Sequence, residues 1–486
     1  MLYKKKSLTI IFFLLILFLS GCGITGGIVR APRQKAVREP VAAGQFYPPN
    51  GNELYSLVKS FLDNTEKTIS EEVHAIIVPH AGYQYSGELA AKSFRQVNKP
   101  YERVFIIASN HNGNINFDGI SIPSKFTHYK TPLAETEISK ASYELLNDKS
   151  GLFKSIEGAH TLQMIEVELP FLQVLNPNFE LIPMILGRLT DEQLEKFVDK
   201  LLEYDDGKTL YVFSIDLSHY YSYDEALKLD GFCLGSLMSY NYKNINQCIT
   251  DGNNILLAFL QLAIQKNLDI SVIDYKNSGD TTGDKESVVG YSSVVAHTKT
   301  FLSNSEKSLL LSLARDTIKL YVKDDEILEP KLIFTFPRLF RKRGVFVSLE
   351  KAGMLRGSIG SLMPVQPMYL AVRDNAINAA TKDVRFEPVQ PDELDDIKVT
   401  VSILDIPILI KANNWQEYLD QLTPLEDGVI IVYNNKQSTY LPQVWEQLPD
   451  KEEFLSRLCL KQDSPQDCWK SPDVDIYKYN AQVIHE

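Results

Sequence analysis

Three histidines follow three short apolar runs in this chain, and histidine is the commonest metal ligand among the side chains of proteins. His80, His111 and His219 each lie within four residues of the end of such a run, and Asp216 lies just before the third of them. If these side chains converge, the imidazoles can bind iron, copper or zinc. Two histidines with Asp216 would match the facial triad that iron uses for oxygen chemistry, whereas three histidines would match a zinc centre that activates water. The spacing leaves this choice open.

The apolar runs themselves, at residues 76–78, 104–108 and 211–215, predict strands that are buried on both faces of a parallel sheet. Ligands of open parallel sheets bind outside the carboxyl ends of the strands, where all three histidines fall. We therefore expect an α/β domain with a mainly parallel sheet flanked by helices. The 31 residues between His80 and His111 match one βαβ unit, which would lay the first two strands near one another.

Other side chains near these runs have weaker claims to a role. Tyr83 is a candidate catalytic residue that could donate a hydrogen bond to a bound ligand, and packing at a helix start is the equally favoured alternative. Asp216 is a candidate ligand, general base or orienting partner of an imidazole. The other histidines lack the strand-end context and are interpreted as structural or surface residues: His74, His128, His160, His297 and His485.

Periodicity predicts the remaining elements of two domains, because 486 residues are too many for one ordinary core. In the first domain we expect helices at 86–97, 227–238 and 254–265, a helix capped by Thr190 and Gln193, strands at 180–186 and 291–297, and a loop at 277–290. Residues 298–308 mark the boundary. In the second, α+β domain we expect helices at 309–321 and 368–380, strands at 344–349 and 399–404, a hairpin at 428–440, and a glycine-rich loop at 355–360 with an exposed Arg356.

Composition narrows the class of protein further. A formal charge of −12 and a pI near 5.3 argue against a nucleic-acid partner, which requires a basic surface. The five cysteines are few and scattered, so neither a disulfide framework nor a structural zinc site is indicated. Cys459 and Cys468 could pair in an oxidising compartment, and two unpaired thiols are the simpler prediction.

The first 22 residues predict a bacterial lipoprotein signal peptide. Lys4, Lys5 and Lys6 precede the 12-residue apolar stretch 8–19, which is too short for a comfortable membrane span, and Leu-Ser-Gly-Cys follows. This resembles a lipobox, so we expect lipidation of Cys22 and a lipid-anchored, extracytoplasmic protein at the cell membrane. An uncleaved membrane anchor is the alternative. Residues 23–39 are expected to be a tether.

Several motifs in residues 41–297 resemble the Memo family, and several in the second half resemble an AMMECR-type domain. The first set is PHAGYQYSG at 79–87, NH at 110–111, YKTPL at 129–133, IEVELPF at 165–171, DLSH at 216–219 and SGD…GD…SVVGY at 278–291. The second set is GVFVSL at 344–349, LRGSIG at 355–360, RFEP at 385–388 and LPQV at 441–444. The chain thus resembles proteins B and A of the AmmeMemoRadiSam system joined together, as a Memo-like domain at 40–300 and an AMMECR-like domain at 306–475.

The resemblance implies a fold related to the extradiol dioxygenases and a metal pocket at His80, His111, Asp216 and His219. It also implies iron or copper as the cofactor and a radical S-adenosylmethionine protein as a partner. This sequence departs from the family pattern in three places. The pocket cysteine of the family aligns near Asp251, so a thiolate ligand would require Cys248 to move into its place. Position 163 is Gln instead of the His of a Glu-His pair, and Ser358 replaces a common cysteine.

These observations support three hypotheses. The leading one is a membrane-tethered oxidoreductase or dioxygenase-like protein that binds iron or copper. A non-catalytic adaptor that recognises a peptide or modified protein is the second, and the missing thiols favour it. A zinc hydrolase is the third.

Overall fold

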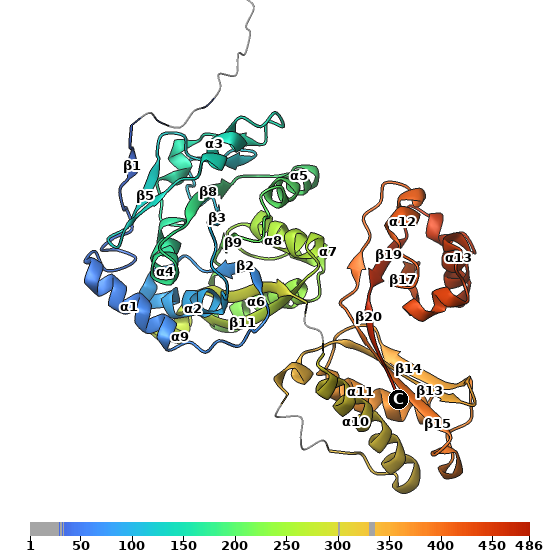
Figure 1. Cartoon of the computed structure of the whole chain (residues 1–486). Coiled ribbons are helices and arrows are strands. Elements are labelled where there is room, and N and C mark those ends of the chain that lie inside the picture. The colour runs from blue at the N-terminus through green and yellow to red at the C-terminus, as the bar shows by residue number, and fades with distance from the viewer. Residues whose placement is uncertain (1–28, 30–31, 33, 300–301, 330–335) are drawn as a thin grey trace, which may run out of the picture.

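The computed structural model describes residues 29, 32, 34–299, 302–329 and 336–486, which form two domains (Figure 1). The predicted signal peptide and Cys22 lie outside the described residues. Within the described residues, no helix is long and apolar enough to cross a membrane.

The N-terminal domain contains a nine-stranded sheet whose centre is parallel, as predicted. Its central strands are β2 (Val73–Val78), β9 (Thr209–Ser214), β3 (Arg103–Ser109) and β8 (Glu180–Leu186), in that order across the sheet. The outer strands are β12 (Val288–Thr298), β10 (His219–Tyr221), β11 (Leu268–Asn277), β4 (Ile120–Ser121) and β7 (Phe153–Lys154), and several of their pairings are antiparallel. The strands before His80 and His111 are not direct neighbours, because β9 lies between them. All three still end at the same edge, since they run in parallel.

Helices cover both faces of this sheet, so its central parallel strands are mostly apolar and buried (Figure 1). Along β2, Ile76 and Val78 belong to one core and Ala75 and Ile77 to the other, because successive side chains point to opposite faces. The first core includes side chains from α1 (Gly51–Asp63), α2 (Tyr83–Gln96) and α4 (Leu169–Leu175). The second includes side chains from α3 (Lys140–Leu146), α5 (Asp191–Leu202), α6 (Tyr223–Met238), α7 (Tyr242–Ile245) and α8 (Asn253–Gln265).

Some local predictions for this domain are confirmed and others are wrong. Thr190 and Gln193 form the predicted capping box at the start of α5. The expected loop at 277–290 instead contains α9 (Ser278–Thr282), and strand β11 before it was not predicted. The predicted tether ends earlier than expected, because β1 (Val37–Arg38) pairs with β5 (His128–Lys130) in a small sheet completed by β6 (Glu135–Glu137).

The C-terminal domain is α+β, as predicted, and contains two four-stranded sheets. The first has the order β14 (Met354–Ser361), β13 (Gly344–Lys351), β15 (Ile397–Leu404) and β20 (Ala481–His485). The second has the order β16 (Ile408–Leu409), β19 (Asp475–Tyr479), β17 (Gly428–Tyr433) and β18 (Lys436–Tyr440). Helices α10 (Asn304–Asp324) and α11 (Met368–Thr381) pack on the first sheet, and α12 (Trp415–Gln421) and α13 (Lys451–Lys461) on the second. Since β19 and β20 belong to these sheets, the domain extends past residue 475.

The glycine-rich segment 355–360 is part of strand β14 and not a loop, so that prediction is wrong. Arg356 is also not an exposed turn residue. Its guanidinium donates to both carboxylate oxygens of Glu393, at 3.1 and 2.8 Å, and this hydrogen bonding lowers the pKa of Glu393 to about 2. The Ser358 hydroxyl lies 2.9 Å from that of Ser348 on β13. Cross-strand pairing therefore accounts for this motif.

The four described cysteines form two disulfides, which corrects the prediction of unpaired thiols. Cys459 bonds to Cys468 within the C-terminal domain, and Cys233 bonds to Cys248 within the N-terminal domain. Their Cα atoms lie 5.9 and 5.4 Å apart, within the usual range for disulfides. The spacing in sequence did not reveal the second pair, because α6 and α7 must pack before these two thiols meet.

Candidate metal centre

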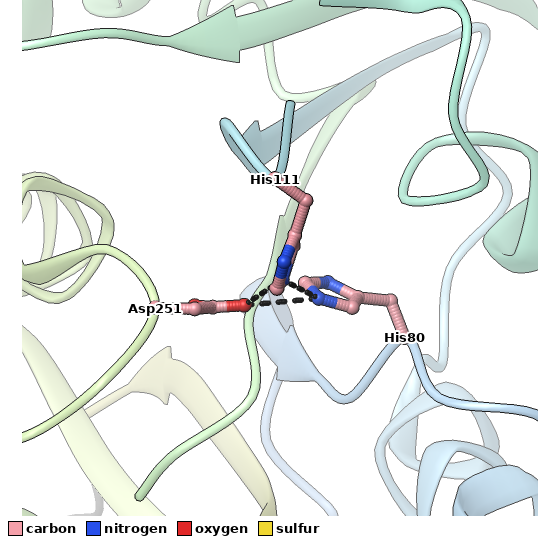
Figure 2. Close-up of side chains that lie close together, drawn as sticks. All are labelled: His80, His111 and Asp251. Carbon is pink, nitrogen blue, oxygen red and sulfur yellow. Dashed lines mark hydrogen bonds and ion pairs between the residues drawn. The ribbon is translucent and has the colours of Figure 1, made fainter. Parts of the chain in front are cut away.

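Three ligand-type side chains converge at the carboxyl edge of the parallel strands (Figure 2). His80 follows β2, His111 follows β3, and Asp251 immediately precedes the N-cap of α8. The positions of the two histidines are fixed because each lies two residues after the end of a buried strand. Helix α8 fixes the carboxylate because its apolar side chains fill the core beneath the same edge.

The three contacting atoms form a small triangle. The Nε2 atoms of His80 and His111 lie 2.8 Å apart. Oδ2 of Asp251 lies 3.0 Å from Nε2 of His80 and 2.5 Å from Nε2 of His111. His80 and Asp251 are almost entirely buried, and His111 is partly exposed. The site is therefore closed on one side and open on the other.

Buried polar groups behind His80 set the orientation of its ring. Its Nδ1 lies 3.0 Å from the hydroxyl of Ser214, which also contacts the carbonyl of Met164 and a carboxyl oxygen of Glu168. Burial raises the pKa of Glu168 to about 8, so this group is a neutral acid at pH 7. With Ser214 donating to Met164, its oxygen can accept from both Nδ1–H and the protonated carboxyl. This arrangement leaves Nε2 of His80 as the nitrogen that faces Asp251.

The charges in the site depend strongly on one another. Burial alone would raise the pKa of Asp251, but the charges and hydrogen bonds of His80 and His111 hold it well below its ordinary value. Burial alone would lower the pKa of His80, but the carboxylates of Asp216 and Asp251 raise it to about 9. Burial also raises the pKa of Asp216. A protonated His80 thus lies between the two carboxyl groups.

The donor set fits a divalent metal ion. Two imidazole nitrogens and one carboxylate oxygen face a common point, and such 2-His-1-carboxylate sets hold non-haem iron with open coordination positions. The second oxygen of Asp251, Oδ1, is buried without a hydrogen-bond partner among the described residues. Buried carboxylate oxygens usually find a partner, and a cation beside the carboxylate would satisfy this atom.

The structure places Asp216 and His219 next to this triangle and not within it. Oδ1 of Asp216 accepts the backbone N–H of His80 at 3.0 Å, and its Oδ2 lies 3.8 Å from Nε2 of His80. The rings of His219 and His111 are 6.1 Å apart between centroids. Nδ1 of His219 donates to the carbonyl of Leu217 at 2.8 Å, so in the neutral imidazole Nε2 carries the lone pair. Asp216 therefore orients His80, and His219 borders the site.

Tyr83 does not line the site. Its ring packs against Tyr47, Phe61 and Phe171 in the core, and its hydroxyl donates to the carbonyl of Val167 at 2.6 Å. Of the two interpretations of Tyr83, the structure supports packing at the start of a helix. His160 is likewise structural, because its two nitrogens contact the hydroxyls of Ser121 and Tyr129 and burial lowers its pKa to about 3.

Sequence reasoning did not select Asp251 as a ligand. The signal was present, since this residue stands where the resemblance places the pocket cysteine. Cys248, the alternative thiolate, cannot take that role while it is bonded to Cys233. The third member of the triangle in this chain is therefore a carboxylate.

A parallel sheet covered by helices, with histidines and a carboxylate at its carboxyl edge, defines this chain as an α/β protein with a candidate metal centre, joined to an α+β domain. The model of Memo-like proteins matches residues 38–295, and the AMMECR1 model matches residues 311–484. The chain belongs to the Memo family and continues into an AMMECR1 domain. Both resemblances drawn from the motifs are confirmed.

Individual relatives match one part of the chain each. A protein of Methanothermobacter thermautotrophicus is 40% identical over 191 residues, which are 38% of this chain and 96% of that protein. A MEMO1 family protein of Thermoplasma acidophilum is 29% identical over 271 residues, which are 53% of this chain and 98% of that protein. The crystal structure of an uncharacterized protein from Pyrococcus horikoshii is 35% identical, with a TM-score of 0.36, and covers 37% of this chain and 92% of that one.

Proposed function

We propose that the N-terminal domain binds iron at His80, His111 and Asp251 and acts as an oxidoreductase or dioxygenase-like protein. The observation that carries this proposal is the convergence of two imidazole nitrogens and one carboxylate oxygen within 2.5–3.0 Å of one another. Iron is favoured over copper because a carboxylate stands where a thiolate would select softer metals. A bound iron ion would supply one-electron and oxygen chemistry.

The protein residues around the ion have distinct tasks in this proposal. His80 and His111 bind it through Nε2, and Ser214 holds His80 in the tautomer that this requires. His219 presents a basic Nε2 beside the site, so it can take a proton from a substrate hydroxyl. Asp216 stays hydrogen-bonded to the His80 backbone and keeps the loop in place.

A substrate has room next to Asp251. A cavity of about 260 Å³ is lined by Asp251 together with Asn110, Asn116, Arg188 and Asn254 among others, whereas His80, His111 and His219 do not line it. Amide and guanidinium groups suit a small polar substrate with oxygen groups. A substrate with a phenolic or other oxygen group is consistent with such a lining.

Metal analysis tests the proposal. Protein purified without added metal is expected to hold about one iron ion per chain, and the His80→Ala/His111→Ala variant less than about a tenth of that, because two of three ligands are gone. The matched control is His485→Ala, whose side chain is exposed on β20.

Each outcome of the metal analysis has a defined meaning. Unchanged iron in the double variant would contradict the site. Zinc as the sole metal would favour a hydrolytic centre, and a folded, metal-free wild type would favour the adaptor hypothesis.

The same proposal includes a location and a partner. A lipid on Cys22 would hold the protein at the outer side of a cell membrane, and the two disulfides support an oxidising compartment. The fusion of Memo-like and AMMECR1 domains supports a place in the AmmeMemoRadiSam system, with its radical S-adenosylmethionine protein as the partner.

Replacing Cys22 tests the lipid anchor. The Cys22→Ala variant is expected to leave the membrane fraction almost completely, because the acyl chains that bury methylenes in the bilayer cannot be attached. Fractionation followed by immunoblotting measures this, with Cys459→Ala as the matched control. A variant that stays membrane-bound would indicate the uncleaved anchor instead.

A further inference from the structure

The segment that carries Asp251 runs from residue 246 to 252, between α7 and α8, and its hydrogen bonds are mostly local. The Thr250 hydroxyl contacts Oδ1 of Asn253 at 2.8 Å, and it accepts the N–H of Gly252 at 3.1 Å. Asn253 donates to the carbonyl of Asn246 at 3.3 Å. The N–H of Asp251 reaches the carbonyl of Asp216 only at 3.4 Å. These bonds shape the segment, and its C-terminal end is held by α8, which begins at Asn253, and by the contacts of Asp251 with His80 and His111.

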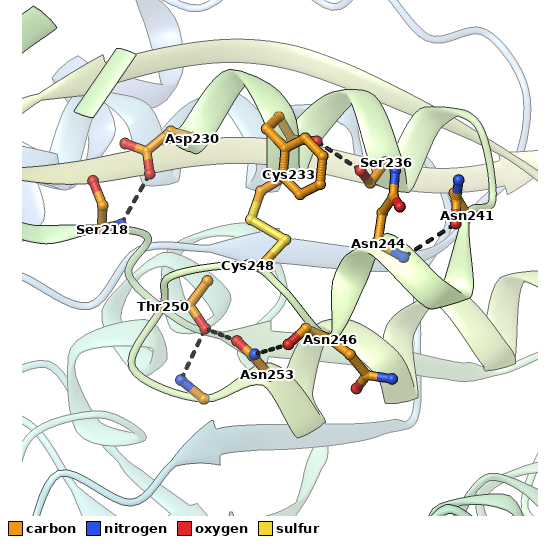
Figure 3. Close-up of a disulfide and its surroundings, with 12 residues drawn as sticks. Ser218, Asp230, Cys233, Ser236, Asn241, Asn244, Asn246, Cys248, Thr250 and Asn253 are labelled. Atoms are coloured by element: carbon orange, nitrogen blue, oxygen red, sulfur yellow. Dashed lines mark hydrogen bonds between the residues drawn. A yellow bond between two sulfur atoms is a disulfide. The ribbon is translucent and has the colours of Figure 1, made fainter. Parts of the chain in front are cut away.

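A covalent bond supplies a second attachment, nearer the start of the segment. Cys248, three residues before Asp251, is bonded to Cys233 in the middle of α6 (Figure 3). Both cysteines are buried, at 0% and 5% exposure, among the apolar side chains of the core below the sheet edge. The disulfide therefore anchors the Asp251 segment to a helix that is itself fixed by packing.

The same helix holds a second segment of the site one turn earlier. Oδ1 of Asp230 on α6 accepts the N–H of Ser218 at 3.0 Å (Figure 3). Its Oδ2 accepts the Tyr275 hydroxyl at 2.8 Å. Ser218 lies between Asp216 and His219. Because Asp230 and Cys233 are three residues apart, they share one face of the helix. Helix α6 thus supports both the His219 segment and the Asp251 segment.

We propose that the Cys233–Cys248 disulfide positions Asp251 for metal binding, so that the metal affinity of the site responds to thiol–disulfide exchange. This inference rests on the proposed metal centre. Reduction breaks one S–S bond: a dithiol supplies two electrons and two protons, the protein gains two thiols, and the dithiol becomes a disulfide. The Asp251 segment then has more freedom, and the carboxylate must be ordered when the ion binds.

Reduction should lower the metal affinity by about as much as removing a residue that orients a metal ligand. Affinity for Fe(II) should fall roughly 10- to 100-fold in the reduced protein, and the ion should dissociate faster. Because the disulfide is buried, its reduction by a small dithiol requires local opening of the 246–252 segment. Opening of this segment therefore both releases the metal ion and exposes the disulfide to the reductant.

The test is anaerobic titration of the full chain with Fe(II) alone, in its oxidised form, after reduction by a dithiol and desalting, and as Cys233→Ser/Cys248→Ser. The matched control is Cys459→Ser/Cys468→Ser, which removes the other disulfide and should change the affinity less than about twofold. Reoxidation of the reduced wild type should restore the original affinity, which separates a positioning role from loss of folding.

Three results would count against the inference. Equal affinity in oxidised and reduced wild type would overturn it, as would an equal loss in the control variant. Free thiols at positions 233 and 248 in protein isolated from an oxidising compartment, detected by alkylation and mass spectrometry, would also overturn it. If the oxidised wild type itself binds no Fe(II), the proposed metal centre fails instead, so the two failures are distinguishable.

Discussion

The Asp251→Ala variant is expected to bind Fe(II) at least about 100-fold more weakly than the wild type, because it removes the only negative ligand of the described triangle. The two imidazoles that remain, whose Nε2 atoms lie 2.8 Å apart, would have to bind the ion without a compensating negative charge. Asp251→Asn should show an intermediate loss, since it preserves shape and removes charge. Anaerobic competition titration with a chromophoric chelator measures both.

The matched control for this experiment is Asp224→Asn, an exposed acidic residue at the start of α6. It should leave the affinity unchanged. Asp251→Cys provides a test of metal choice, because a thiolate at this position should shift the preference toward copper or zinc relative to iron. Undiminished Fe(II) binding by Asp251→Ala would show that His219 or Asp216 supplies the third ligand.

The Glu166→Gln variant should destabilise the protein by about 3–5 kcal/mol, the usual cost of breaking a buried ion pair from one side. Glu166 is fully buried, and its Oε2 lies 2.5 Å from Nη1 of Arg38, which is also buried. The same carboxylate accepts the N–H groups of Val41 and Ala42 at 2.8 Å and the Tyr47 hydroxyl. Removing its charge leaves the Arg38 guanidinium buried without a counter-ion.

Urea unfolding of the full chain measures this effect, with Glu192→Gln as the control. Glu192 forms an exposed pair with Lys196 at 2.7 Å on α5, so its replacement should leave the free energy of unfolding almost unchanged. Comparable losses in the two variants would refute the claim that Glu166 ties the N-terminal segment to the domain.

The order of strands and helices along the chain was largely predictable, because the formation of each helix or strand depends mainly on residues close to it in the sequence. The run 180–186 predicts a strand, and β8 has the same bounds. Thr190 and Gln193 predict the start of α5 for a similar reason, since a capping box involves residues only three apart. The position of His80 and His111 at the sheet edge also followed, because parallel strands place their carboxyl ends together.

Other features were not predictable because their partners are distant in the sequence. The ion pair of Arg38 with Glu166 spans 128 residues, and periodicity does not reveal such a contact. The pairing partner of β14 explains why a glycine-rich segment is a strand, although its composition favours a loop. The disulfide between Cys233 and Cys248 likewise depends on how α6 and α7 pack.

The sequence by itself determined the family, the two-domain order and the strands at the centre of the first sheet, and it singled out two of the three side chains of the candidate triangle. The tertiary structure alone decided the third, because Asp251 reaches the edge through the packing of α8, not through any strand. It also separated His219 and Asp216 from the triangle. The physical reason is that hydrophobic periodicity predicts the secondary structure of one segment. Contact between two loops that are distant in the sequence depends on how the helices and strands beneath them pack.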